Sequence, residues 1–345
     1  MLYKTIQFNN SNIFSLFIVK RKRSQRGFCV DCSKLVVIDD VETTNQHENH
    51  VMKLNLSISA VQSPSKLLAQ HKRNKQEAQY HFRSSTTLFL VNLLKDLGLT
   101  NLICIGTTTI HECIQQNYID KNIRSILLDI DDRYSQFYLP SQFIHFNMFN
   151  YHFFDKSGLS MLEWFLRKSK PNEIALIVDP PFGGLMEALS QTVLKINELI
   201  QTIHELDQSY QLKVLLIMPY YLEKMVVKNF QSVYMSDYRI IYMNHRKLKT
   251  SNSSVRLFTN IEGTQLRLPE KRYKFCTKCQ RYVSLTNVHC DKCKNCTASA
   301  KPMKHCDPCG VCRIYNHFHR SDLTDDVHSE MLTLSDATSK IFVTQ

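Results

Sequence analysis

The cysteines and histidines of this sequence follow the spacing of metal ligands. Eight of the 12 cysteines lie between Cys276 and Cys312 in a chain of 345 residues. A Cys-x2-Cys pair there precedes two copies of a His-Cys-x2-Cys-x2-Cys unit. Thiolates and imidazoles at this density hold zinc in tetrahedral sites, with disulfides as the alternative. The candidate ligands are Cys276, Cys279, His289, Cys290, Cys293, Cys296, His305, Cys306, Cys309 and Cys312.

The repeat predicts interlocked zinc sites. Each ion would take one Cys-x2-Cys pair, the histidine of the following unit and the last cysteine of that unit. The two resulting sets are Cys276, Cys279, His289 and Cys296, and then Cys290, Cys293, His305 and Cys312. Cys306 and Cys309 would begin a third site, completed by His319 or His317, because Arg320 stands where the repeat would place a cysteine.

A separate ligand pattern lies near the start of the sequence. Cys29 and Cys32 form one pair, His47 and His50 form another, and 14 residues separate them. This Cys2His2 spacing predicts a further zinc module, although a Cys-x2-Cys pair also occurs by chance near surface histidines.

The segment Asp179-Pro180-Pro181-Phe182 carries the groups needed for chemistry on a weak, planar amine. The Asp179 carboxylate and the Pro180 carbonyl can each accept a hydrogen bond from an exocyclic amine, which favours a more nucleophilic nitrogen. Both prolines have a fixed φ and hold these acceptors together. Phe182 can stack on a base that has left its helix. The pattern predicts an amine methyltransferase, and an ordinary turn after a strand is the alternative.

Apolar runs alternate with helical patterns between residues 84 and 266. Continuous runs of this kind predict a mainly parallel sheet covered on both faces, which is the α/β class. Two later runs, 238–242 and 255–258, predict an antiparallel pair at the end of the sheet. The five earlier runs are 102–105, 126–128, 143–144, 174–178 and 214–217.

Residues at the carboxyl ends of these strands are candidates for a cofactor site, because open α/β sheets bind ligands at that edge. Gly106 allows the backbone to pass close to a ligand. Asp129 is the candidate for holding ribose hydroxyls, with Asp131 as a rival. The full set of candidates is Gln79, Tyr80, Phe82, Ile105, Gly106, Asp129, Asn147, Met148 and Asp179.

The net charge of +12 is concentrated where the cysteines are. Residues 1–34 carry +6, residues 267–320 carry +9, and the long middle, 35–266, carries +1. Basic zinc modules beside a neutral domain predict a nucleic-acid partner, although basic charge also serves solubility. We expect an intracellular chain, since no secretory signal and no apolar run long enough to cross a membrane is evident.

These features divide the sequence into five segments. The first ends in the basic run KRKRSQR, a weak signal for nuclear import or RNA contact. The segments are a basic N-terminus (1–26), a C2H2-type zinc module (27–62), a methyltransferase domain (63–266), a Cys/His-rich zinc domain (267–320) and an acidic tail (321–345).

Several strings resemble one known family. They are CIGTTTIHE, LLDIDDRYSQFY, FNMFNYHFF, DPPFGG and YKFCTKCQRYVSLTNVHCDKCKNC, and the likeness spans roughly residues 28–319. The sequence is similar to the zinc-finger CCHC-domain-containing rRNA N6-adenosine methyltransferases, with a class I (Rossmann-like) fold. The resemblance implies N6-methylation of an adenosine in large-subunit rRNA, S-adenosyl-L-methionine as donor, the 179–182 motif as catalytic, and a location in the nucleolus, nucleus or cytoplasm.

The sequence departs from this family at both ends. No match to the family's N-terminal GRF-type finger or to its C-terminal CCHC knuckle is found, and the alternatives are a truncated sequence, a divergent species or weaker substrate binding. We expect no DNA or membrane partner.

Two other functions remain open. Protein lysine methyltransferases that act on translation factors resemble this core and have a DPPF-like motif, but a lysine target needs no phosphate-binding surface. A non-catalytic RNA-binding scaffold is the third hypothesis, and intact residues at the strand ends argue against it.

Overall fold

The computed structural model describes residues 18–38, 47–69, 80–118, 122–230, 232–245, 253–297 and 303–314, with the single positions 248 and 250. Two compact units make up the chain, residues 1–265 and residues 266–345. Gln79, His317 and His319 lie outside the described residues. Within the described part, no helix has the length and apolar composition needed to cross a membrane.

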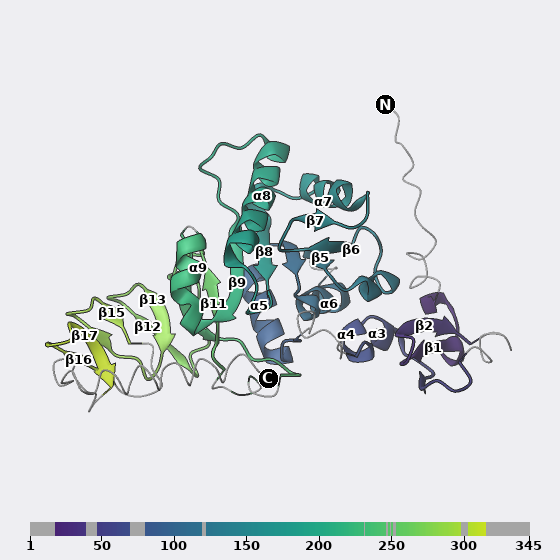
Figure 1. The fold of residues 1–345 in the computed structure, drawn as a ribbon, viewed down its shortest axis with the longest axis horizontal. Helices are drawn as coiled ribbons and strands as arrows, with labels where there is room; N and C mark the ends of the chain where they lie inside the picture. The colour runs from purple at the N-terminus through teal and green to yellow at the C-terminus, as the bar shows by residue number, and fades with distance from the viewer. Residues whose placement is uncertain are drawn as a thin grey trace, which may run out of the picture. The chain divides into compact units, whose positions relative to one another are not determined.

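An eight-stranded sheet forms the centre of the first unit (Figure 1). Six strands run parallel, while β11 and the short β7 are antiparallel to their neighbours. In spatial order they are β10 (Tyr234–Arg239), β11 (Val255–Thr259), β9 (Lys213–Pro219), β8 (Ile174–Val178), β4 (Asn101–Ile105), β5 (Arg124–Asp129), β6 (Phe143–Asn147) and β7 (His152–Phe153).

The central strands form because their sequences are apolar throughout. Every residue of β4 and of β8 is buried, as expected for parallel strands covered on both faces. The predicted α/β class is therefore confirmed, including the antiparallel pair of β10 and β11. The predicted run at 238–242 was wrong in position, because β10 begins at Tyr234 and ends at Arg239. Ser236 and Asp237 are buried in this strand and hid it from a search for apolar residues.

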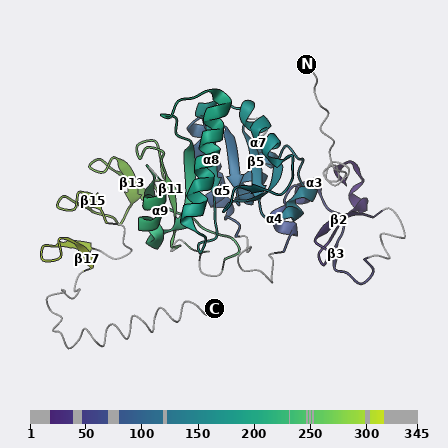
Figure 2. The ribbon, with the colours of Figure 1, turned by 45° about the horizontal axis from the view of Figure 1, so that its top comes forward.

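Helices cover the two faces of the sheet. One face packs on α7 and α8, which lie side by side (Figures 1 and 2), and on α9. α6 contacts β4 and β5 of the sheet, and α5 packs on α6. The bounds are α5 (Ser84–Asp96), α6 (Thr108–Asn117), α7 (Gly158–Arg167), α8 (Met186–His204) and α9 (Glu223–Asn229), with the 3-10 turns η5 (Asp132–Gln136), η6 (Pro171–Glu173) and η7 (Tyr220–Leu222).

A small three-stranded sheet precedes this domain within the first unit. Gln136 joins it to η5, since its Oε1 accepts from the Leu35 amide at 2.7 Å and its Nε2 donates to the Ser33 carbonyl at 2.9 Å. The elements are η2 (Arg23–Gln25), β1 (Arg26–Cys29), β2 (Lys34–Val37), β3 (Met52–Lys53), α3 (Ile58–Val61) and α4 (Pro64–Leu67).

The described part of the second unit, residues 266–297 and 303–314, contains three successive two-stranded hairpins. Each pairs antiparallel strands around Cys/His-rich turns. The strands are β12 (Tyr273–Cys276), β13 (Arg281–Ser284), β14 (His289–Cys290), β15 (Asn295–Cys296), β16 (Met303–Cys306) and β17 (Val311–Ile314).

Candidate active site and candidate metal centres

The candidate active site lies where the strand order reverses. The chain passes from β4 to β5 on one side and from β8 to β9 on the other, so the ends of β4 and β8 flank the switch point. Ile105 and Val178 are paired in register, and the Asp179 amide donates to the Ile105 carbonyl at 3.1 Å. Ligands of open α/β sheets bind in the crevice at such a point. The topology thus places Ile105, Gly106 and Asp179 together.

Gly106 is required where β4 ends. Its φ is +65°, and an added Cβ would lie 2.9 Å from the Asp179 carbonyl oxygen. A side chain would therefore be strained and would also collide with backbone. The two strand ends can approach this closely only because position 106 has no side chain, which leaves exposed backbone for a ligand.

Asp179 directly follows β8, and its side chain is partly buried. Its Oδ1 accepts a hydrogen bond from the Tyr242 hydroxyl at 2.7 Å. Burial raises the pKa of this carboxyl well above its ordinary value, and the hydrogen bond from Tyr242 opposes that rise. The site therefore holds a carboxyl of increased basicity next to a fixed donor.

Tyr242 belongs to a short antiparallel pairing that brings distant segments of the chain together. Phe82 and Tyr242 form an isolated β-bridge, with ring centroids 5.3 Å apart. Tyr80 lies 6.0 Å from the Tyr242 ring and is 36% exposed, so it stands at the surface of the same cluster. Two predicted cofactor residues, Tyr80 and Phe82, are thereby placed around the Asp179 contact.

Tyr242 was not among the residues singled out from the sequence. It lies in an apolar run that is typical of a strand, and 63 residues separate it from Asp179. No local spacing links the two. Only the pairing of the segments around Phe82 and Tyr242 shows that the hydroxyl faces the carboxylate.

The loop after Asp179 packs on the loop after β6. A Cβ added to Gly184 would lie 2.2 Å from Cζ of Phe149, so the Phe149 ring fills the space beside this glycine. Phe182 is partly buried and packs against the hydrophobic core. The loop is consequently held from both sides.

The two acidic candidates after β5 have different partners. Asp131 binds the Arg133 guanidinium with both carboxylate oxygens, at 2.8 Å to Nε and 2.6 Å to Nη2. Asp129 is only 2% exposed, and its Oδ1 accepts from the Asp131 amide at 3.0 Å. The ion pair with Arg133 already accounts for the conformation of the Asp131 side chain. We therefore favour Asp129 as the acid that binds the ligand.

The residues after β6 also reach the switch point. The Met148 side chain is 9% exposed, and its Cε would lie 3.4 Å from a Cβ added to Gly106. The Asn147 side-chain oxygen accepts from the Phe149 amide at 2.9 Å and shapes the turn. The structure describes eight of the nine predicted cofactor residues. Six of them end a strand or directly follow one (β4, β5, β6 or β8), and the other two are Tyr80 and Phe82.

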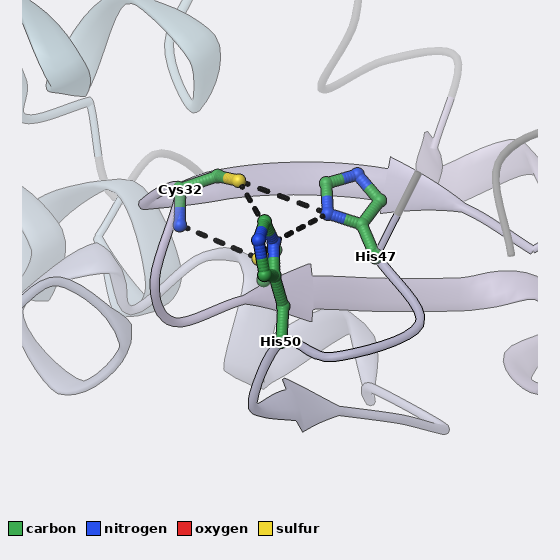
Figure 3. A group of neighbouring side chains, drawn as sticks. Cys32, His47 and His50 are labelled. Atoms are coloured by element: carbon green, nitrogen blue, oxygen red, sulfur yellow. Dashed lines mark hydrogen bonds between the residues drawn. The ribbon is translucent and has the colours of Figure 1, made fainter. Parts of the chain in front are cut away.

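The N-terminal candidate ligands converge in the three-stranded module (Figure 3). Their ligand atoms lie within 4.8 Å of one another. Cys32 Sγ is 3.3 Å from Nδ1 of His50 and 3.7 Å from Nδ1 of His47, and Cys29 Sγ is 3.4 Å from Nδ1 of His50. Tetrahedral zinc with bonds of about 2.0–2.3 Å gives ligand separations of roughly 3.3–3.8 Å. The set fits a zinc ion.

The structure groups the C-terminal ligands as the repeat predicts. The two described sets are Cys276, Cys279, His289 and Cys296, and Cys290, Cys293, His305 and Cys312. His289 Nδ1 lies 3.1 Å from Cys279 Sγ, and His305 Nδ1 lies 3.2 Å from Cys293 Sγ. None of the described cysteines forms a disulfide, so their sulfur atoms are available to bind zinc as thiolates.

Cys306 and Cys309 lie on the β16–β17 hairpin and belong to none of these three sets.

Two ion pairs between charged side chains connect one hairpin of the second unit with the next. Lys278 is paired with Asp291, which lies 3.6 Å from Nε2 of His289. Lys292 and Asp307 repeat this arrangement beside His305 at 3.4 Å.

The sheet order and the site at its switch point define a Rossmann-like, class I methyltransferase. Residues 73–263 match the family described as "Probable N6-adenine methyltransferase". The chain belongs to this N6-adenine methyltransferase family, and the predicted resemblance is confirmed. Membership implies S-adenosyl-L-methionine as the methyl donor.

Curated relatives from several vertebrates match most of the chain. The human protein named rRNA N(6)-adenosine-methyltransferase ZCCHC4 is 42% identical over 286 residues, which cover 80% of this chain and 55% of the relative. Proteins of the same name from Bos taurus (42% over 280 residues, 78% and 54%) and Xenopus tropicalis (35% over 277 residues, 77% and 56%) also match. The chain spans about half the length of the curated relatives it matches.

Proposed function

We propose that this protein transfers a methyl group from S-adenosyl-L-methionine to N6 of an adenosine in large-subunit rRNA. The observation that carries the proposal is Asp179, a partly buried carboxylate at the switch point, followed by the two prolines and the aromatic residue of the motif. The named activity of the relatives supports the choice of adenosine and of rRNA.

Asp179 and Pro180 give the site its selectivity for an amino group. The Asp179 carboxylate accepts one N–H of the amine, and the Pro180 carbonyl accepts the other. Phe182 stacks on the base once it has left its helix or loop. Because these groups are fixed before the substrate arrives, catalysis rests on positioning and electrostatics.

Bound S-adenosyl-L-methionine supplies an electrophilic methyl group. The nitrogen that accepts the methyl loses one N–H proton, so the products are N6-methyladenosine, S-adenosylhomocysteine and a proton. Asp179 would receive that proton, and burial, which raises the pKa of this carboxyl above its ordinary value, increases its basicity. No metal is needed in this step.

Backbone and side chains around the switch point would hold the donor. The close approach at Gly106, which a Cβ would fill, leaves backbone open to the ligand. Asp129 would accept hydrogen bonds from the ribose hydroxyls, and Asn147 with Met148 would hold the adenine ring. Tyr80 and Phe82 would close over the methionine end.

The three Cys/His sets would bind zinc and so order the modules that contact RNA. Support comes from the charge of +9 in residues 267–320 and +6 in residues 1–34. Lys and Arg side chains on such modules bind phosphates without reading the sequence. The rRNA substrate also leads us to propose a nucleolar, nuclear or cytoplasmic location.

Replacement of Asp179 with Ala tests the proposal. The variant should transfer methyl groups to rRNA at least about 100-fold more slowly, because it loses the acceptor for the amine. Transfer of tritiated methyl from the donor to purified large-subunit rRNA measures the rate. Undiminished transfer by the variant would refute the assignment, and label found in protein instead of RNA would favour the lysine methyltransferase.

A further inference from the structure

We propose that Tyr242 is a positioning residue that fixes the Asp179 carboxylate through Oδ1 and thereby dedicates Oδ2 to the substrate amino group. The inference rests on the proposed function for what Oδ2 accepts. The hydrogen bond between Tyr242 and Asp179 does not itself depend on that function.

The contact is short and enclosed. The Tyr242 hydroxyl donates to Asp179 Oδ1 at 2.7 Å, and Tyr242 is only 1% exposed. Hydrogen bonds to ionised groups are stronger than those between neutral groups, particularly away from water. Rotation of the carboxylate about its Cβ–Cγ bond would break this bond. The orientation of Oδ2 is therefore set before substrate binds.

Backbone hydrogen bonds hold Tyr242 in place from both sides. The Met243 amide donates to the His81 carbonyl at 2.7 Å, and the Arg83 amide donates to the Ile241 carbonyl at 2.8 Å. The Tyr242 amide itself donates to the Leu248 carbonyl at 3.1 Å. The hydroxyl is therefore attached to a rigid pairing of two segments, which suits a group that orients another.

The electrostatics agree with a neutral tyrosine that donates to a carboxylate. Burial, followed by the charge of Asp179, raises the pKa of Tyr242 well above its ordinary value, so its proton remains on the hydroxyl. The same hydrogen bond lowers the pKa of Asp179 against the effect of burial. Other titratable or charged groups on the surrounding elements are Tyr80, His81, Arg83 and His245 of the paired segments, Asp129 at the end of β5 and Asp131 just after it.

The proposal is tested with Tyr242→Phe, which removes the hydroxyl and keeps the ring. Carbon-13 NMR of carboxyl-labelled aspartate follows the Asp179 titration in the full chain, and Asp179→Asn identifies its signal. We expect a higher Asp179 pKa in the variant. An unchanged titration would overturn the inference whether or not the protein methylates RNA.

Kinetics give the second readout. In Tyr242→Phe the acid limb of the pH profile of kcat should move to higher pH, with kcat about 10-fold lower at neutral pH. Affinity for S-adenosyl-L-methionine should stay unchanged. A pH-independent loss of kcat would identify a merely structural role and refute the inference. Absence of methyl transfer in the unmutated protein would instead refute the proposed function, while the NMR titration would still decide the role of Tyr242.

Tyr210→Phe is the matched control. Its hydroxyl donates to the Pro171 carbonyl at 3.0 Å, and Pro171 lies just before β8, at the opposite end of this strand from Asp179. The control removes one partly buried tyrosine hydroxyl without touching the site. It should leave both the Asp179 titration and the pH profile unchanged.

Discussion

The central sheet and the Cys/His hairpins are stabilised in different ways. All residues of β4 and β8 are buried, whereas none of the residues in β16 or β17 is. Burial of apolar surface stabilises the sheet by about 25 cal/mol per Å². Hairpins with so little buried surface cannot fold in the same way, but each carries clustered metal ligands. The difference implies that one region is held by packing and the other by metal.

The same contrast separates two tasks. The sheet holds Asp179 at the switch point, where the carboxylate is partly buried and a hydrogen bond from Tyr242 orients it. The hairpins leave their basic side chains in solvent, where Lys274 and Lys278 are exposed. Chemistry benefits from enclosure, while contact with phosphates needs accessible charge.

Removal of zinc should have the largest effect and should leave the central sheet folded. We expect Cys293→Ser to unfold the β14–β17 hairpins, because the metal supplies their folding free energy, and a chelator to unfold the other two zinc modules as well. Hydrogen exchange followed by mass spectrometry should show lost protection there and retained protection in β4 and β8. Zinc content per chain should fall in parallel.

Cys113→Ser provides a control for the cysteine substitution. Cys113 lies in α6 and in none of the three ligand sets. The variant should keep its zinc and its exchange pattern. Hairpins that stay protected after the metal has been removed would break the contrast between the two regions.

Gly106→Ala should damage the packed region. The new Cβ would lie 2.9 Å from the Asp179 carbonyl at a φ of +65°, so we expect a loss of about 2–4 kcal/mol in the free energy of unfolding of this unit. Affinity for S-adenosyl-L-methionine should fall at least about 100-fold for the same reason. Denaturant unfolding and calorimetric titration measure the two effects.

Gly183→Ala is the matched control for this substitution. No atom lies within 4 Å of a Cβ added at Gly183, which is two residues from Pro181 in the same loop. Stability and donor affinity should remain close to those of the unmutated protein. Equal effects of the two substitutions would show that Gly106 has no special place at the strand ends.

Changes in pH should alter the stability of the two regions in opposite directions. The effect should be smaller than that of zinc removal or of Gly106→Ala. Burial raises the pKa of Glu112 from 4.5 to about 7, although two hydrogen bonds from Ser65 oppose the rise. The folded state thus binds this proton more tightly than the unfolded state, and its contribution is complete below pH 4.5. This contribution to the free energy of unfolding, roughly 1–3 kcal/mol, is lost as the pH rises to about 7.

Glu112→Gln should remove that pH dependence, as denaturant unfolding between pH 4.5 and 7.5 would show. The zinc hairpins should instead lose metal as the pH falls, since their ligands become protonated. A Glu112→Gln variant with the same pH dependence as the unmutated protein would refute the assignment of the effect to this carboxyl.

Features with a local cause could be predicted from the sequence. The strands β4 and β8 are continuous apolar runs, and the turn after β8 carries its own proline constraints. The zinc sets could be grouped because the repeat places equivalent ligands at equal intervals. β10 was misplaced because buried Ser236 and Asp237 interrupt its apolar pattern.

Features that depend on long-range pairing could not be predicted. Tyr242 reaches Asp179 only through the antiparallel pairing at Phe82. The choice between Asp129 and Asp131 depends on where the Arg133 guanidinium lies, and spacing does not determine a side-chain conformation. In both cases the chemistry of the residue was visible in the sequence, and its partner was not.

Identification of the methylated product tests the central claim most directly. The full chain is incubated with labelled S-adenosyl-L-methionine and an extract that contains large-subunit rRNA and its proteins, and the labelled products are digested and separated. We predict label in N6-methyladenosine from the rRNA, and none when Asp179 is replaced with Ala. Label in methyllysine, or no label with the unmutated chain, would contradict the account.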